Sequence, residues 1–204
     1  PCTVISCIGF TNCFFGRLRA AEHFLTCDLG YSNLRFYGGL SVLICIEHAD
    51  TRRMVRQTLL GFNASEVREA ASPADVLRHL HANRRLHVGL IDGALGGNAL
   101  RVVRAIRLAP QSPRRDLPIL LMTHQPTPEL IAAARDAGVD DLIAKPFTTA
   151  SFFAKLDDVV RRPRTLINAE SYFGPDRRRL QRAFKGPDRR KQVADVVIRP
   201  VAPP

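Results

Sequence analysis

Between residues 42 and 161, short apolar runs alternate with segments in which apolar residues recur at helical spacing. Residues 42–46 are all apolar and mostly β-branched, which is typical of a parallel strand buried on both faces. The predicted strands are residues 42–46, 66–69, 87–92, 118–123 and 141–145, and the predicted helices are a segment after Asp50 and residues 74–81, 98–108, 129–137 and 151–161. This alternation predicts an α/β fold with a doubly wound, five-stranded parallel sheet and helices on both faces.

Several residues mark the ends and the buried faces of these helices. Asp50 is expected to cap the first helix. Gly138 is expected to end the fourth, because glycine suits the position that follows a helix. In the last helix Phe152, Leu156 and Val160 recur four apart, which predicts a face turned to the core. The apolar stripe of the first helix is predicted to consist of Met54, Val55, Leu59 and Leu60.

Polar side chains stand where four of the predicted strands end: Glu47, Asp92, Thr123 and Lys145. In open parallel sheets, sites form beyond the carboxyl ends of the strands, near the topological switch point. We therefore expect these four side chains to converge in one crevice. One such residue alone would only mark the start of a loop, but four of these types together indicate a functional site.

The same residues resemble the CheY-like receiver domain of bacterial response regulators. Residues 42–48 are similar to the segment that holds the family's acidic pair, and residues 90–92 to the strand that ends in its phosphate-accepting aspartate. Residues 122–123 resemble the strand that ends in a hydroxyl. Residues 133–138, followed by residues 144–147, are similar to the family's "ARDAG…KPF" stretch. The resemblance covers about 120 of the 204 residues and implies a flavodoxin-like fold.

The resemblance implies a role in two-component phosphorelay signal transduction. Asp92 would accept a phosphoryl group from a histidine kinase or phosphotransfer protein. Mg²⁺ would be held by Glu47, Asp92 and the backbone carbonyl of Ala94, in keeping with its preference for oxygen ligands. Lys145 and Thr123 would contact the phosphoryl oxygens, and the metal and the lysine would offset their charge. Such a signalling domain is not an enzyme beyond, at most, Mg²⁺-dependent self-phosphorylation and dephosphorylation.

Four departures from the family pattern affect this site. Ile46 occupies the second position of the acidic pair, and Glu47 is one methylene longer than the usual aspartate. The loop at residues 93–97 is one residue shorter than usual and lacks its proline, and Leu142 stands where the family often has an aromatic residue. Loss of a partner near a metal ligand can already lower metal affinity roughly 10–100-fold, so we expect weakened Mg²⁺ binding.

Two hypotheses within the family follow from these departures. In the first, phosphorylation of Asp92 shifts a two-state equilibrium in the loop and helix after Thr123, and the domain then acts on a downstream protein target. In the second, the chain is a degenerate pseudo-receiver that binds its protein partner without phosphorylation.

Charge divides the chain into three predicted parts. Residues 1–40 form an N-terminal extension of unknown role, residues 41–162 the receiver domain, and residues 163–204 a basic, flexible tail. The net charge is +11, and most of it lies beyond residue 160. Because only about 40 residues follow the receiver, no separate output domain is expected.

The tail contains a tandem repeat, Gly-Pro-Asp followed by three basic residues, at residues 174–179 and 186–191. It resembles the tail of a group of bacterial single-domain receivers. Three interpretations stay open: a solvated flexible tail, a motif that folds against a partner or the receiver surface, and attachment to nucleic acid or an anionic membrane.

Other classes of function have weaker support in the sequence. Four of the five cysteines lie in residues 1–27 at irregular spacings, so no zinc site is predicted, and Cys45 is expected to be a buried small hydrophobe in a reduced, cytoplasmic setting. No transmembrane segment is expected. Flavodoxin-like sheets also serve flavoproteins and hydrolases, but the isolated pair Gly96 and Gly97 is only a weak phosphate-loop signal. His48 and His124 are expected at the rim of the crevice.

Overall fold

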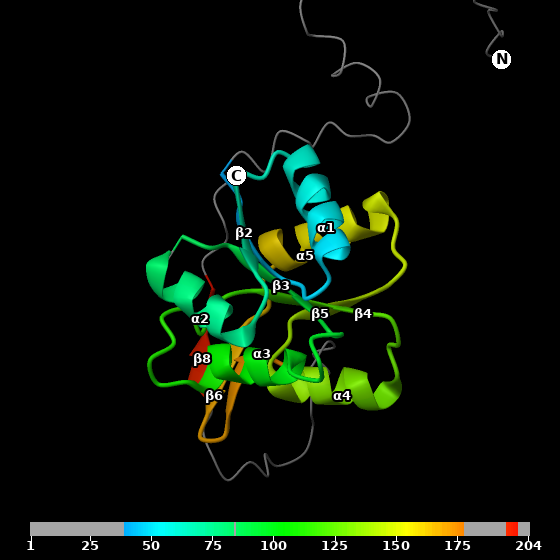
Figure 1. The fold of residues 1–204 in the computed structure, drawn as a ribbon. Coiled ribbons are helices and arrows are strands. Elements are labelled where there is room, and N and C mark those ends of the chain that lie inside the picture. Colours follow the sequence, from blue (N-terminus) through cyan, green and yellow to red (C-terminus); the bar gives the residue numbers. More distant parts are fainter. Residues whose placement is uncertain (1–38, 84, 178–194, 200–204) are drawn as a thin grey trace, which may run out of the picture. The chain divides into compact units, whose positions relative to one another are not determined.

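A parallel sheet of five strands forms the centre of the fold (Figure 1). The strands are β1 (Ser41–Cys45), β2 (Glu66–Ala70), β3 (Val88–Asp92), β4 (Ile119–Thr123) and β5 (Asp141–Ala144), in the spatial order β2-β1-β3-β4-β5. The helices are α1 (Ala49–Gly61), α2 (Pro73–Ala82), α3 (Ala99–Leu108), α4 (Pro128–Ala137) and α5 (Thr149–Arg161). The predicted doubly wound α/β fold is confirmed.

This computed structural model describes residues 39–83, 85–177 and 195–199, which all belong to one unit of residues 34–204. Nearly all of the predicted N-terminal extension and the second copy of the repeat lie outside the described residues. Among the described residues, no helix has the length and apolar character that crossing a membrane requires.

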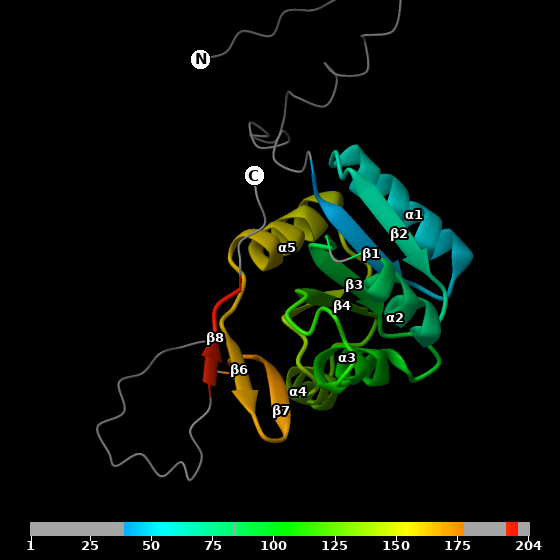
Figure 2. The ribbon, with the colours of Figure 1, turned by 90° about the vertical axis from the view of Figure 1, so that its left-hand side faces the viewer.

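Two hydrophobic cores hold the helices on the sheet. Helices α1 and α5 cover one face, and α2, α3 and α4 cover the other (Figures 1 and 2). As predicted, Phe152, Leu156 and Val160 of α5 are buried. In α1 the buried face is narrower than predicted, because Val55 and Leu59 are buried while the other two predicted members are not. Met54 is 54% exposed and Leu60 38%.

Side-chain caps fix the start of α2, α4 and α5. Thr127 accepts a hydrogen bond from the backbone of Leu130 at 3.2 Å, and equivalent caps come from Ser72 and Thr148. Gly138 ends α4 with φ at +96°, as predicted. Asp50 is not the cap of α1, because the helix already begins at Ala49 and His48 is its N-cap residue. Asp50 lies in the first turn, where its negative charge interacts favourably with the helix dipole.

A second sheet follows α5, where the sequence led us to expect a flexible tail. Strands β6 (Leu166–Ala169), β7 (Tyr172–Pro175) and β8 (Asp195–Val197) pair antiparallel in the order β7-β6-β8. Strand β7 packs against α3 and α4 (Figure 2). Within the described residues, the first repeat therefore begins in a strand that lies on the receiver surface.

Close backbone packing explains the glycine of that repeat. A Cβ atom on Gly174 would lie 2.8 Å from the Cα atom of Gly138 and 2.7 Å from the hydroxyl oxygen of Tyr172. Real Cβ atoms do not approach so closely, so the strand can lie on the end of α4 only with glycine at this position. The neighbouring Phe173 is buried, and the guanidinium of Arg115 lies 4.3 Å from its ring centroid.

Substitution of Gly174 by alanine tests this packing. We expect Gly174→Ala to lower the free energy of unfolding by about 1–3 kcal/mol, the usual cost of overpacking. Urea denaturation followed by circular dichroism measures the change. The control is Gly61→Ala, since a Cβ at Gly61 would meet no atom within 4 Å. If both variants unfold like the unaltered protein, the contact between Gly174 and Gly138 does not hold β7.

Candidate functional site

A buried ion pair lies at the carboxyl edge of the central sheet. Asp92, the last residue of β3, is 1% exposed, and the Nζ atom of Lys145 lies 2.7 Å from its Oδ2 atom. The other carboxylate oxygen accepts a hydrogen bond from the backbone N–H of Ala94 at 3.2 Å. A carboxylate loses its hydration when it is buried, so it needs a partner of opposite charge. Lys145 is that partner.

Thr123 stands beside this pair because β4 is the neighbour of β3. Its backbone oxygen accepts a hydrogen bond from the N–H of Lys145 at 2.7 Å, and its Oγ1 atom accepts one from the N–H of Gln125 at 3.2 Å. Gly93 follows Asp92 and lies against the end of β4. A Cβ atom on Gly93 would lie 3.0 Å from the backbone oxygen of Met122. The loop after Asp92 can therefore pass close to the end of β4.

Ile46 and Glu47 occupy the positions that hold the acidic pair in the family. One step beyond the paired residues Cys45 and Ile91, the register of β1 and β3 places Ile46 beside Asp92. Ile46 is fully buried in the core that α1 and α5 cover, so no oxygen ligand stands there. Glu47 is exposed, and its side chain forms no hydrogen bond or ion pair with any described residue.

The predicted Mg²⁺ ligands do not fit a resident metal. No group of three or more His, Cys, Asp or Glu side chains suited to a metal ion occurs in the described residues. Asp92 is engaged by Lys145, and the backbone oxygen of Ala94 accepts a hydrogen bond from Gly96 at 2.6 Å. Because Mg²⁺ requires near-octahedral oxygen coordination, Glu47 and Asp92 alone fall short of such a site.

Arg52 lies at this edge of the sheet and was missed in the sequence. Its Nη1 atom donates to the backbone oxygens of Ile46 at 2.7 Å and Glu47 at 3.2 Å, and its Nε atom lies 3.1 Å from Glu69 at the end of β2. An arginine in the first turns of a helix has no sequence signal that separates it from a solvated one. The guanidinium therefore binds the backbone of the two acidic-pair positions, and Glu69 offsets its charge.

Two further predictions concern neighbours of the pair. Cys45 is buried as predicted, and burial, with the charges of Asp75 and Asp92, raises the pKa of its thiol to about 12. The thiol is therefore neutral and unreactive at neutral pH. His48 and His124 are both exposed in the loops that follow β1 and β4, as expected for rim residues.

The sequence and the fold both match known proteins. The model of the response regulator receiver domain matches residues 42–157. The chain is 27% identical over 122 residues to a chemotaxis protein CheY homolog of Campylobacter jejuni, with 59% of this chain and 92% of that protein covered. It is 29% identical over 126 residues to chemotaxis protein CheY-3 of Vibrio cholerae, with 60% and 93% covered.

The structure of chemotaxis protein CheY4 of Vibrio cholerae superimposes with a TM-score of 0.54 at 26% identity. The match covers 59% of this chain and 98% of that one. Sequence and fold thus agree on the same segment, in which Asp92, Thr123 and Lys145 meet at one edge of the sheet. The chain belongs to the family of response regulator receiver domains.

Proposed function

We propose that Asp92 accepts a phosphoryl group from a histidine kinase or phosphotransfer protein, and that the chain signals through contacts with a downstream protein. The observation that carries this proposal is the buried pair of Asp92 and Lys145 beside Thr123. In the transfer, a carboxylate oxygen of Asp92 forms a bond to phosphorus while the bond from phosphorus to the donor's histidine nitrogen breaks. Lys145 offsets the charge of the phosphoryl oxygens, and the hydroxyl of Thr123 donates a hydrogen bond to one of them.

Weakened binding of Mg²⁺ forms part of this proposal. Receiver domains generally bind Mg²⁺ at their acidic pocket. Here Ile46 leaves that pocket without one carboxylate, and the guanidinium of Arg52 binds the backbone beside it. Loss of a partner of a metal ligand already lowers metal affinity roughly 10–100-fold, so loss of a ligand should lower it at least as much. Lys145 therefore carries more of the charge compensation than it would beside a tightly held metal.

The second candidate is a pseudo-receiver that binds its partner without phosphorylation. The burial of Ile46 at the position of an acidic ligand favours it. In that case the pair of Asp92 and Lys145 would serve only to hold the ends of β3 and β5 together.

Phosphorylation with acetyl phosphate separates the two candidates. At millimolar Mg²⁺, we expect intact-mass spectrometry to detect one added phosphoryl group on the unaltered chain. Asp92→Asn should add none, because its amide is not a nucleophile toward phosphorus, and Asp116→Asn is the matched control away from the site. The pseudo-receiver is the better description if the unaltered chain gains no mass in the presence of millimolar Mg²⁺.

Restoration of the missing carboxylate tests the metal proposal. We expect Ile46→Asp to raise Mg²⁺ affinity roughly 10–100-fold, measured from amide NMR shifts of Ala94 and Thr123 during a Mg²⁺ titration. Met54→Asp adds the same charge at an exposed position of α1 and should change nothing. Circular dichroism checks that each variant is folded. Equal Mg²⁺ affinity of a folded Ile46→Asp variant and the unaltered chain would contradict the proposal.

A further inference from the structure

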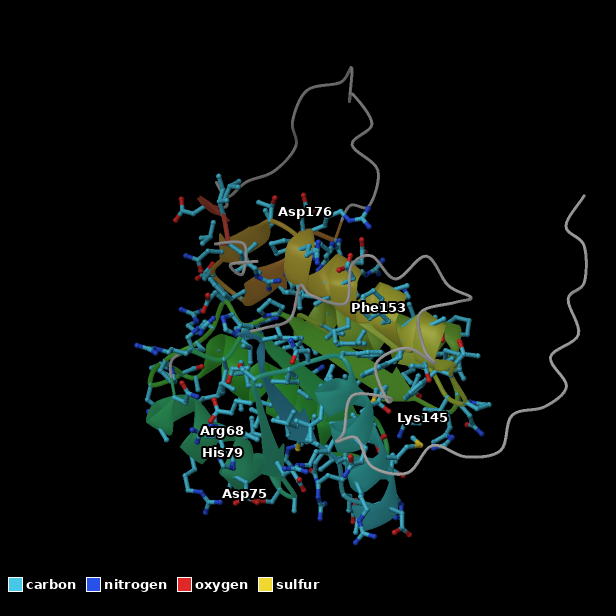
Figure 3. All side chains as sticks on the ribbon, turned by 90° about the horizontal axis from the view of Figure 1, so that it is seen from above. Arg68, Asp75, His79, Lys145, Phe153 and Asp176 are labelled. Atoms are coloured by element: carbon cyan, nitrogen blue, oxygen red, sulfur yellow. The ribbon has the colours of Figure 1, made fainter. Side chains whose placement is uncertain are left out.

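A second pocket lies between α4, β5 and the C-terminal segment. Its volume is about 550 Å³, and three of its lining residues are arginines from different parts of the fold. Arg135 belongs to α4, Arg164 follows α5, and Arg177 follows β7. Among the described residues, the lining includes none of the phosphoacceptor residues. Figure 3 shows Lys145 well apart from Asp176, the neighbour of Arg177.

Positive charge exceeds negative charge around this pocket. Asp140, in its wall, is held between Arg107 at 2.9 Å and Arg199. Asp141, also in the wall, lies 2.5 Å from the Nζ atom of Lys155. The cations that line or back the pocket are Arg107, Arg135, Lys155, Arg164, Arg177 and Arg199. The carboxylates are Asp136, Asp140, Asp141 and Asp176. The balance favours an anion.

Buried arginines behind the wall add to this field. Arg107 and Arg199 are both buried, and the two guanidinium groups share the single carboxylate of Asp140. Burial lowers the pKa of Arg107 only to about 10, so this group stays charged at neutral pH. The Nε and Nη2 atoms of Arg199 are buried and have no hydrogen-bond partner among the described residues. A buried charge with incomplete compensation costs free energy, and an anion nearby reduces that cost.

The shape and the other lining residues narrow the class of ligand. The volume lies in the range of small-molecule sites, roughly 300–1,000 Å³. Ile131, Val139 and Leu142 supply an apolar part of the lining. Arg164 donates to the backbone oxygens of Asp140 and Asp176. The Nη1 atom of Arg177 lies 3.3 Å from the Oδ1 atom of Asp136. A guanidinium has five N–H donors in a planar fork that matches phosphate oxygens, so donors remain for a ligand.

We propose that this pocket binds a small organic phosphate, with its phosphate groups at Arg164 and Arg177 and its apolar part on Ile131 and Leu142. The site exists only because the C-terminal segment lies on the receiver, since that segment supplies two of the three arginines. The proposal does not depend on phosphorylation of Asp92.

Calorimetric titration of the full chain at low salt tests the proposal, with ADP, adenosine and pyrophosphate as probes. We expect ADP to bind at least tenfold more tightly than adenosine, because the arginines contact only the phosphates. Pyrophosphate should bind more weakly than ADP, because it leaves the apolar lining uncovered. Equal affinities for ADP and adenosine would show that the arginines do not bind the phosphate groups. Equal affinities for ADP and pyrophosphate would show that the apolar lining does not contact the organic part of the ligand.

Substitutions in the pocket and away from it test where ADP binds on the protein. Arg164→Ala with Arg177→Ala should weaken ADP binding at least tenfold, while Arg101→Ala with Arg104→Ala removes the same charge from exposed positions of α3 and should not. Should the first pair lose its fold, Ile131→Glu serves instead, because it adds a negative charge at an exposed position of the lining. Asp92→Asn should keep ADP binding even where it loses phosphorylation. ADP affinity that survives both pocket variants would refute the site.

Discussion

The carboxylate of Asp140 joins the receiver to the segment that follows it. It accepts hydrogen bonds from the backbone N–H of Ile119 in β4 at 2.8 Å and from Arg107 of α3 at 2.9 Å, and it pairs with Arg199 beyond β8. Arg107 also donates to the backbone oxygen of Gly138 at the end of α4 at 3.0 Å. Helix α3, strand β4 and the C-terminal segment therefore meet at one buried carboxylate, and Arg107 extends this contact to the end of α4. Removal of this carboxylate would leave two buried guanidinium groups uncompensated in a medium of low dielectric constant.

The buried charges around Asp92 and those around Asp140 differ in their net charge. Asp92 and Lys145 balance each other at the carboxyl edge of the sheet, so the pair carries no net charge. Asp140 faces two arginines, so the other cluster keeps an excess of positive charge. The first cluster suits the addition of a charged group to its own carboxylate, because Lys145 is already in place. The second suits a bound anion, because its carboxylate is already occupied.

The strands that carry the proposed phosphoacceptor site were predictable because β1, β3 and β4 are buried on both faces, which leaves continuous apolar runs in the sequence. Asp92 and Thr123 stood out as polar residues at the ends of such runs. Lys145 stood out as a polar residue at the end of a predicted strand and as part of the stretch that resembles the family, and the structure brings it to Asp92. Glu47 met the same criterion and yet points into solvent, because a single strand-end position does not determine where a long side chain turns.

The C-terminal sheet was beyond the reach of sequence patterns for a different reason. Its stability depends on contacts between residues far apart in the chain, such as Gly138 with Gly174 and Asp140 with Arg199. The local sequence of the repeat at residues 174–179 predicts a turn followed by basic residues. It contains no signal that its glycine packs against the end of α4.

Helix α4 connects the two sites described above. Its first residue follows Thr123 by a loop of four residues, and its last turn precedes Gly138, which touches Gly174 of β7. Arg135, in that last turn, lines the second pocket. Packed interiors shift between discrete arrangements and do not deform continuously, so α4 cannot change its position without displacing β7 or Arg135. Any movement of α4 that begins at Thr123 is therefore opposed by the contact between Gly138 and Gly174, and a ligand held by Arg135, Arg164 and Arg177 would add to that opposition.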